Sequence, residues 1–257
     1  MLQQQTVERL IAMKLPGMAE ALRDWLARPR DPTLPAADLV GLLADAEWIS
    51  RENKKLTGRL RQASFKQTTA SVEDVDYRYA RGLQKAKLTE LSSSRWVESH
   101  QNIIITGPTG IGKSYLACAL GNKACRDGYV VIYRRVTRLF DELAQARGDG
   151  THHLLLRRLA KANLLILDDF GLQPLVAEER KELIEVLEDR YGVSSTIVTS
   201  QVDPAGWHAV IGDATLADSI CDRLVHNAHR LRLTGESMRK IMSTTSEEIA
   251  KGKVKSE

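Results

Sequence analysis

From about residue 102 onward, the chain alternates short apolar segments with longer amphipathic ones. Five apolar segments are present, at residues 103–106, 129–133, 164–168, 196–200 and 229–233. The connections between them are long enough for crossover helices, and parallel strands need such connections. Segments such as NLLILDD are almost entirely apolar, which is typical of strands buried on both faces. The sequence therefore predicts an α/β core with a parallel sheet flanked by helices over residues 102–242.

A glycine-rich loop follows the first predicted strand. Its sequence, GPTGIGKS, matches the pattern G-x-x-x-x-G-K-[ST]. In such a loop the backbone N–H groups surround the phosphates, Lys113 reaches the β- and γ-phosphates, and the Ser114 hydroxyl ligates magnesium. The following helix adds the positive end of its dipole. We therefore predict that ATP and Mg²⁺ are cofactors and that the nucleotide is bound by Gly107, Pro108, Thr109, Gly110, Ile111, Gly112, Lys113 and Ser114.

The strand predicted at residues 164–168 ends in two adjacent carboxylates. At a strand terminus one carboxylate can hold Mg²⁺ through its water shell and the next can polarise the attacking water. We assign Asp168 to the metal and Asp169 to the water. In the sequence an extra strand, at residues 129–133, separates the loop strand from the acidic strand. This order indicates the additional-strand group of P-loop ATPases and argues against the simpler kinase arrangement.

Two further signals are weaker. The segment TIVTSQ places Thr199, Ser200 and Gln201 at the sheet edge that carries the phosphate loop. Gln201 is the best candidate to sense the γ-phosphate, since its amide both donates and accepts hydrogen bonds. Arg223 could act from a neighbouring subunit to offset the charge of the transferring phosphoryl group. The plainer interpretation of TIVTSQ is a strand end that enters a loop, and that of Arg223 is a solvated Asp-Arg pair on a helix.

The first 70 residues read as helical, with a proline-rich connection around residues 29–35, and their charge is concentrated in one place. Residues 51–66 carry six Lys or Arg and one Glu, a net charge of +5 in a chain whose total is +4. On a helical wheel these basic residues span an arc of about 160°. They are Arg51, Lys54, Lys55, Arg59, Arg61 and Lys66. The arc predicts contact with the DNA backbone, although a solvated face is the alternative.

Two aromatic residues, Trp48 and Phe65, fall in the same arc and could contact sugars or bases. Gly58 also lies there, and glycine costs about 1 kcal/mol in a helix interior. We therefore expect that the helix could break at Gly58.

Five ordered blocks give the chain a family resemblance. They read MKLPGMAEAL, GPTGIGKSYLACALG, LLILDDFGLQPL, TIVTSQ and DRLVHNAHRLRLTGESMRK. Together they resemble the IstB-like ATP-binding proteins, AAA+ helper ATPases of insertion-sequence transposition that are related to the DnaC helicase loader. The resemblance implies a slow, assembly-dependent ATPase that forms homo-oligomers on double-stranded DNA through ATP-bridged interfaces. It also implies that the protein regulates or recruits a partner transposase at target sites.

The resemblance carries over to individual residues. It supports the phosphate loop, Asp168 and Asp169, and it implies Ser200 or Gln201 as the sensor and Arg223 as a finger acting in trans. The function closest to this one is that of a DnaC-like replicative helicase loader, which shares the core. The sequence also leaves open a small-molecule kinase and a non-hydrolysing ATP-binding switch.

The expected organisation has four parts. Residues 1–70 form a helical DNA- or partner-binding domain, residues 71–101 a connecting segment, residues 102–242 the AAA+ core, and residues 243–257 a flexible tail. A C-terminal helical lid is not expected, since only about 24 residues follow the last predicted strand. No apolar run approaches the roughly 20 residues that cross a bilayer, so we expect a cytoplasmic protein without membrane contact. Three cysteines without CxxC spacing, Cys118, Cys125 and Cys221, fit reduced thiols.

Overall fold

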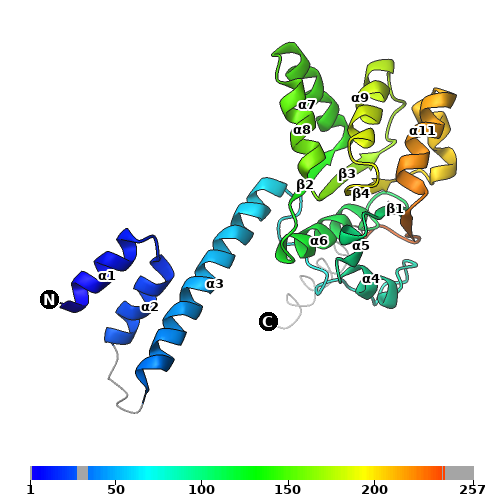
Figure 1. Cartoon of the computed structure of the whole chain (residues 1–257). Coiled ribbons are helices and arrows are strands. Elements are labelled where there is room, and N and C mark those ends of the chain that lie inside the picture. The colour runs from blue at the N-terminus through cyan, green and yellow to red at the C-terminus, as the bar shows by residue number, and fades with distance from the viewer. Residues whose placement is uncertain (1, 28–33, 239, 241–257) are drawn as a thin grey trace, which may run out of the picture. The chain divides into compact units, whose positions relative to one another are not determined.

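The computed structural model describes residues 2–27, 34–238 and 240 (Figure 1). The chain divides into two compact units, Met1–Gly58 and Arg59–Glu257, and each is described by itself. None of the described helices is both long and apolar enough to cross a membrane.

The first unit is helical. It contains α1 (Leu2–Ala12), α2 (Pro16–Ala27) and most of α3 (Ala36–Ala63). Proline suits the first turn of a helix because it has no N–H to leave unpaired, and α2 begins at Pro16. Helices α1 and α2 pack through a small apolar cluster that includes Val7, Leu10 and Ala19. Helix α3 continues through Gly58 without a break, so the break expected there is wrong.

A buried carboxylate joins α2 to α3 within this unit. Glu47 Oε2 accepts hydrogen bonds from the N–H of Gly17 at 2.8 Å and of Met18 at 3.2 Å, which satisfies the free end of α2. Arg51 Nε donates to the other oxygen at 2.7 Å, and this bond is the main reason why the pKa of Glu47 is lowered. The helices approach so closely that a Cβ on Gly17 would lie 2.6 Å from the carbonyl oxygen of Ala46.

The second unit is built on a five-stranded parallel sheet, which confirms the predicted fold class. The strands are β1 (Asn102–Thr106), β2 (Val131–Arg135), β3 (Leu164–Phe170), β4 (Ser195–Ser200) and β5 (Ala228–Arg232). Their order is β2-β3-β4-β1-β5. The strand that lies between the loop strand β1 and the acidic strand β3 in space is therefore β4, and β2 forms an edge. Both β1 and β4 are buried along their whole length, as two-sided cover requires.

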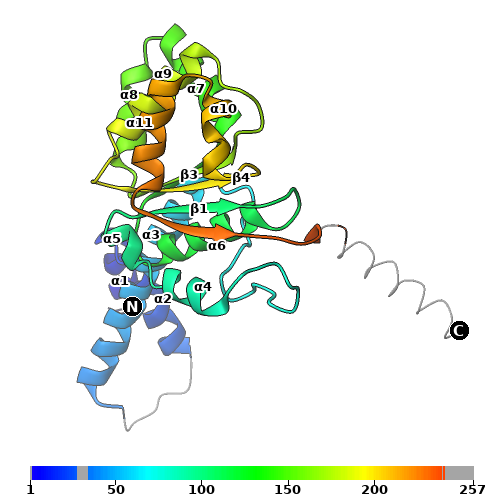
Figure 2. The same ribbon diagram turned by 90° about the vertical axis from the view of Figure 1, so that its right-hand side faces the viewer.

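Helices cover both faces of this sheet. In Figure 2, α7 (Val136–Gly148), α8 (His152–Lys161), α9 (Ala177–Glu188), α10 (Trp207–Ile211) and α11 (Ala214–Val225) lie above the sheet. Helices α4 (Lys85–Leu91), α5 (Arg95–Glu98) and α6 (Lys113–Arg126) lie below it. A 3₁₀ turn at Pro204–Gly206 precedes α10. An apolar core fills the upper layer, where the rings of Phe170 and Trp207 meet edge to face at 4.7 Å.

Helix α3 ends at Ala63, which changes the predicted basic face. Ser64 adopts a left-handed conformation with φ of 56°, and the chain turns there. Phe65 is buried against α6, since a Cβ on Gly121 would lie 2.7 Å from its ring. The expectation that Phe65 shares an exposed helical arc with the basic residues is therefore wrong. Lys66 also lies beyond the helix, so the wheel does not apply to it.

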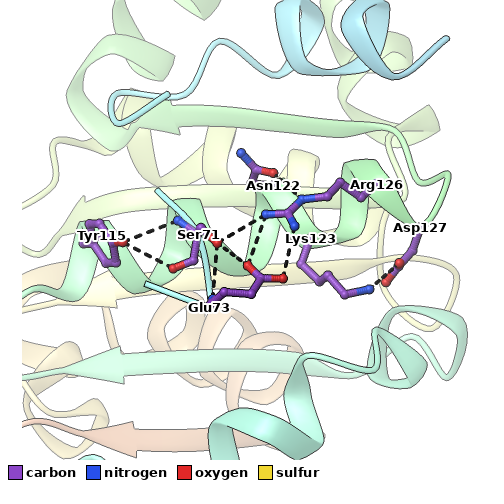
Figure 3. A network of polar contacts seen from close by, with 7 residues as sticks. All are labelled: Ser71, Glu73, Tyr115, Asn122, Lys123, Arg126 and Asp127. Atoms are coloured by element: carbon purple, nitrogen blue, oxygen red, sulfur yellow. Dashed lines mark hydrogen bonds and ion pairs between the residues drawn. The ribbon is translucent and has the colours of Figure 1, made fainter. Parts of the chain in front are cut away.

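An irregular segment then runs along α6 (Figure 3). The hydroxyl of Tyr115 on α6 donates to the carbonyl of Ser71 at 3.2 Å and accepts from its N–H at 3.4 Å. Two residues later Glu73 forms an ion pair with Arg126, with Nη1 and Oε1 3.1 Å apart. These contacts fix the segment against the helix that follows the phosphate loop.

After β5 the chain returns to the phosphate loop. The N–H of Leu233 donates to Thr106 O at 2.8 Å, and the N–H of Met238 donates to Gly110 O at 2.9 Å. Beyond β5 the structure describes residues 233–238 and 240, and no helical lid lies among them. The tail predicted at residues 243–257 lies outside the described residues.

Candidate nucleotide site

A cavity of about 740 Å³ opens at the carboxyl edge of the sheet. Its walls come from the phosphate loop, from residues at the ends of three strands, and from the irregular segment 66–81. In open parallel sheets this edge is the usual place for a ligand. The strand-end residues are Arg135, Asp169 and Gln201.

The phosphate loop folds as its glycines require. Gly107 has φ of 146°, and a Cβ there would lie 2.4 Å from Leu233 O, so the position accepts only glycine. Helix α6 begins at Lys113, directly after the loop. Lys113 is 6% exposed, and its ammonium donates to Gly107 O at 2.8 Å and to Pro108 O at 2.9 Å. Burial lowers its pKa, and an anion in the loop would offset that cost.

Asp168 is fully buried and receives three hydroxyl hydrogen bonds. Ser114 Oγ and Thr199 Oγ1 donate to its Oδ1 at 2.8 and 2.6 Å, and Tyr133 OH donates to Oδ2 at 2.6 Å. Burial, followed by the bond to Asp168, raises the pKa of Tyr133. The Ser114 hydroxyl and the Asp168 carboxylate, side by side, are the hard oxygen donors that Mg²⁺ prefers. The residues present therefore fit this ion, which Ser114 and Asp168 would hold.

Asp169 faces the cavity, unlike Asp168. Its backbone is left-handed, with φ of 63°, and the register between β3 and β4 shifts at this point. Its N–H donates to Thr199 Oγ1 at 3.0 Å, and its carboxylate accepts from Arg135 Nε at 3.1 Å. An aspartate in this conformation is uncommon and is found where the surroundings impose it. The distortion turns two successive carboxylates toward different surroundings.

The polar residues at the end of β4 separate into three roles. Gln201 lines the cavity, and its Oε1 accepts from Thr109 Oγ1 in the phosphate loop at 2.8 Å. Ser200 is fully buried and donates to Phe170 O at 2.8 Å, and it does not line the cavity. The Thr199 hydroxyl holds both acids, since it donates to the carboxylate of Asp168 and accepts from the N–H of Asp169. Of the two sensor candidates, only Gln201 lines the cavity, while Ser200 contacts the loop through its carbonyl, which accepts from Gly107 N at 3.3 Å.

Several residues of the site were not identified from the sequence. Arg135 ends β2 and Tyr133 lies in the middle of that strand, and the rule that ligands bind at carboxyl edges could have indicated Arg135. Asp76 and Arg81 belong to the irregular segment, which shows neither helical nor strand periodicity. No sequence signal marks that segment as part of a cavity.

Arg223 lies on α11 at the opposite edge of the sheet. It lines a second cavity, of about 400 Å³, together with Asn102 and Thr196 near the starts of β1 and β4. Its guanidinium donates to Ser219 O at 2.8 Å, forms an ion pair with Glu188, and lies 5.8 Å from the centre of the Tyr191 ring. Arg223 therefore does not reach the nucleotide cavity of its own chain.

The six predicted DNA-binding residues differ in their surroundings. Lys54, Lys55 and Arg61 are exposed, although Lys55 pairs with Glu52 at 2.8 Å. Three others are engaged elsewhere: Arg51 pairs with Glu47, Arg59 is half-buried, and Lys66 lines the nucleotide cavity. Trp48 is 65% exposed, as a residue in contact with DNA would need to be.

Known proteins resemble this chain along almost its entire length. A family model described as IstB-like ATP binding protein matches residues 8–246. An insertion sequence ATP-binding protein, y4pL, of Sinorhizobium fredii is 50% identical over 93% of this chain and 98% of its own. The IS21 ATP-binding protein of Pseudomonas aeruginosa is 31% identical over 90% of this chain and 86% of its own.

Solved structures share the fold at lower identity. The DnaC helicase loader has a TM-score of 0.56 at 18% identity and covers 64% of this chain and 96% of its own. AMPPCP-bound DnaA from Aquifex aeolicus has a TM-score of 0.58 at 21% identity and covers 72% of this chain and 57% of its own. Both show the α/β fold of AAA+ proteins. The sequence matches go further and show that the chain belongs to the IstB-like family of ATP-binding proteins.

Proposed function

We propose that this protein is an ATP-dependent helper of DNA transposition. It hydrolyses ATP slowly to ADP and phosphate, assembles into oligomers on double-stranded DNA, and regulates or recruits the transposase of its element. The observation that carries the proposal is that Lys113, Ser114 and Asp169 line one cavity, with the buried Asp168 bonded to Ser114. The relatives named for insertion sequences supply the biological setting.

The residues around the cavity divide the chemistry between them. The loop N–H groups and Lys113 bind the phosphates. Mg²⁺, when bound, neutralises charge on the phosphates, and Ser114 with Asp168 holds it. Asp169 takes up the proton of the attacking water once its carboxylate leaves Arg135, and Gln201 orients the water. An aspartate has a shorter reach than the glutamate found here in many AAA+ proteins, which favours slow turnover.

The position of Arg223 supports a role in trans. A neighbouring copy that brings its amino edge to the nucleotide cavity would place this guanidinium near the γ-phosphate. ATP then links two subunits, and hydrolysis releases them. The ion pair with Glu188 keeps the arginine ordered in the separate chain.

Contact with DNA is proposed for the exposed cations of α3. Lys54, Lys55 and Arg61 offer phosphate contacts, and Trp48 offers a surface for sugars or bases. Such binding is independent of base sequence and weakens steeply with salt.

Assembly on DNA tests the proposal. Light scattering of the full chain with double-stranded DNA would compare no nucleotide, ADP and a slowly hydrolysed ATP analogue. We expect large complexes only with the analogue. Lys113→Ala should abolish nucleotide binding, Asp169→Asn should assemble without turnover, and Arg223→Ala should bind ATP without assembling. Arg157→Ala, at an exposed position on α8, is the matched control. A chain that stays monomeric in all three conditions would refute the assembly mechanism.

The fold shared with the DnaC loader makes a helicase loader the second function to test. Pull-down with a transposase and with a replicative helicase separates the two functions. Capture of the helicase alone would favour a loader.

A further inference from the structure

Arg81 places a second buried cation beside the phosphate loop. Its side chain is 5% exposed and lies in the wall of the nucleotide cavity. Nη1 donates to Ile111 O at 3.3 Å, and Nη2 donates to Asp76 O at 3.0 Å. Nε is buried and has no hydrogen-bond partner. These two bonds use two of the five N–H donors of the guanidinium, which lies at the edge of a ligand cavity.

The charge of Arg81 is only partly balanced. Among the described residues no carboxylate forms an ion pair with it. Asp76 favours its charged form from a distance, while the carboxylate of Asp76 is bound by Arg78 at 2.6 Å. Burial lowers the pKa of Arg81. A buried charge is costly unless it is paired, and proteins retain one where a partner or ligand compensates it. Arg81 thus meets the conditions for binding an anion that the chain itself does not supply.

The position of Arg81 points to the nucleotide phosphates. A Cβ on Gly112 would lie 2.8 Å from Nη1, so the guanidinium touches the loop where α6 begins. The first N–H groups of a helix are where phosphates bind. The chain around Arg81 is fixed as well, because Arg81 O accepts from Thr234 N at 3.0 Å and Ser71 is held by Tyr115 (Figure 3).

We propose that Arg81 is a nucleotide-binding residue whose guanidinium donates to a phosphate of the nucleotide bound in its own chain. With Lys113 it places two cations around the phosphates. The inference rests on nucleotide binding at this cavity and is independent of DNA, transposase and assembly. Arginine suits the role because it stays charged when buried and offers several donors in a fixed plane.

Titration with two ligands tests the assignment. Affinities for ATP and for inorganic tripolyphosphate, which lacks base and ribose, would be measured by calorimetry in the wild type, Arg81→Met and Arg81→Lys. We expect Arg81→Met to weaken both ligands by about 10- to 100-fold, the usual effect of losing a charged hydrogen bond. Arg81→Lys should fall between this variant and the wild type. Arg157→Gln, at an exposed arginine of α8 that does not line the cavity, is the control and should change neither affinity more than about threefold.

The melting temperature without ligand separates binding from bracing of the loop. Arg81→Met relieves the cost of a buried charge but loses the bonds to Ile111 O and Asp76 O, so its melting temperature alone does not decide the assignment and is compared with the two affinities. A lower melting temperature with unchanged affinities would show that Arg81 only braces the loop and would overturn the proposal. Weakening of ATP alone would assign Arg81 to the nucleoside and would also overturn it. A wild type that binds neither ligand would refute the nucleotide site as a whole.

If Arg81→Met does not fold, Arg81→Lys decides the question. Its affinity for tripolyphosphate should then be several-fold lower, because lysine has a single ammonium and lacks the planar set of donors of a guanidinium. An affinity equal to that of the wild type would refute the assignment.

Discussion

Thr199→Val removes the hydroxyl that holds both acids of the site. The hydroxyl donates to Asp168 Oδ1 at 2.6 Å and accepts from the N–H of Asp169 at 3.0 Å, and the side chain is fully buried. Valine has nearly the same shape, so packing changes little. A hydrogen bond to a charged group contributes about 1.5–3 kcal/mol, and an orphaned buried N–H costs about 1–3 kcal/mol. Asp168 keeps Ser114 and Tyr133, so we expect a loss of about 2–4 kcal/mol in the free energy of unfolding.

Urea denaturation measures this loss. The fluorescence of Trp96 and Trp207, both buried in the unit 59–257, reports the unfolding of that unit. Thr199→Ser keeps the hydroxyl and is the control, with an expected loss below about 1.5 kcal/mol for the methyl group. ATP turnover should fall in the valine variant as well, because Asp169 loses the bond that fixes its backbone. A valine variant within about 0.5 kcal/mol of the wild type would refute the assignment of Thr199 as the residue that holds the acids.

Three further predictions concern the first unit and α3. The pKa of Glu47 is lowered from 4.5, so this carboxylate stabilises the unit at pH values above 4.5, and the stabilisation is lost as the pH falls through the lowered pKa. Glu47→Gln should therefore remove this loss of melting temperature on acidification, as followed by circular dichroism. Gly17→Ala should destabilise the unit, because the new Cβ would meet Ala46 O at 2.6 Å, and equal melting temperatures would contradict the close approach. Reversal of the charges of Lys54, Lys55 and Arg61 should lower the slope of log affinity for DNA against log salt by about 3 and leave ATP affinity unchanged; an unchanged slope would remove DNA contact from this helix.

The strands and the phosphate loop could be predicted because their signals are local. The five-residue run NIIIT that leads into GPTGIGKS allows few other structures, and the pair Asp168–Asp169 stands at the end of an apolar run. The order of the strands in the sheet could not be predicted from local signals. That β4 separates β1 from β3 depends on pairings between distant segments, and this pairing places Thr199 against both acids.

The basic helix shows why the prediction of a single basic arc that includes Phe65 and Lys66 was wrong. Neither glycine nor proline marks the end of α3 at Ala63, and the chain turns at Ser64 because Phe65 packs against Gly121. That tertiary contact outweighs the helical periodicity. Conversely, Gly58 does not end the helix, since a cost of about 1 kcal/mol is small within a helix of 28 residues. Arg81 was missed for a related reason: a buried cation in an irregular segment leaves no periodic signal.

All five strands run in one direction, so the nucleotide cavity and Arg223 lie at opposite edges of the sheet. Under the proposed joining of copies, each copy uses its arginine on one neighbour and its cavity on another. An open row of copies then has two unlike ends. At one end the ATP cavity receives no arginine from a neighbour, and at the other end Arg223 faces no ATP. Copies therefore bind and dissociate differently at the two ends, and under this mechanism a row on DNA grows with a direction. Only the ATP at the end that lacks a neighbouring arginine is protected from hydrolysis.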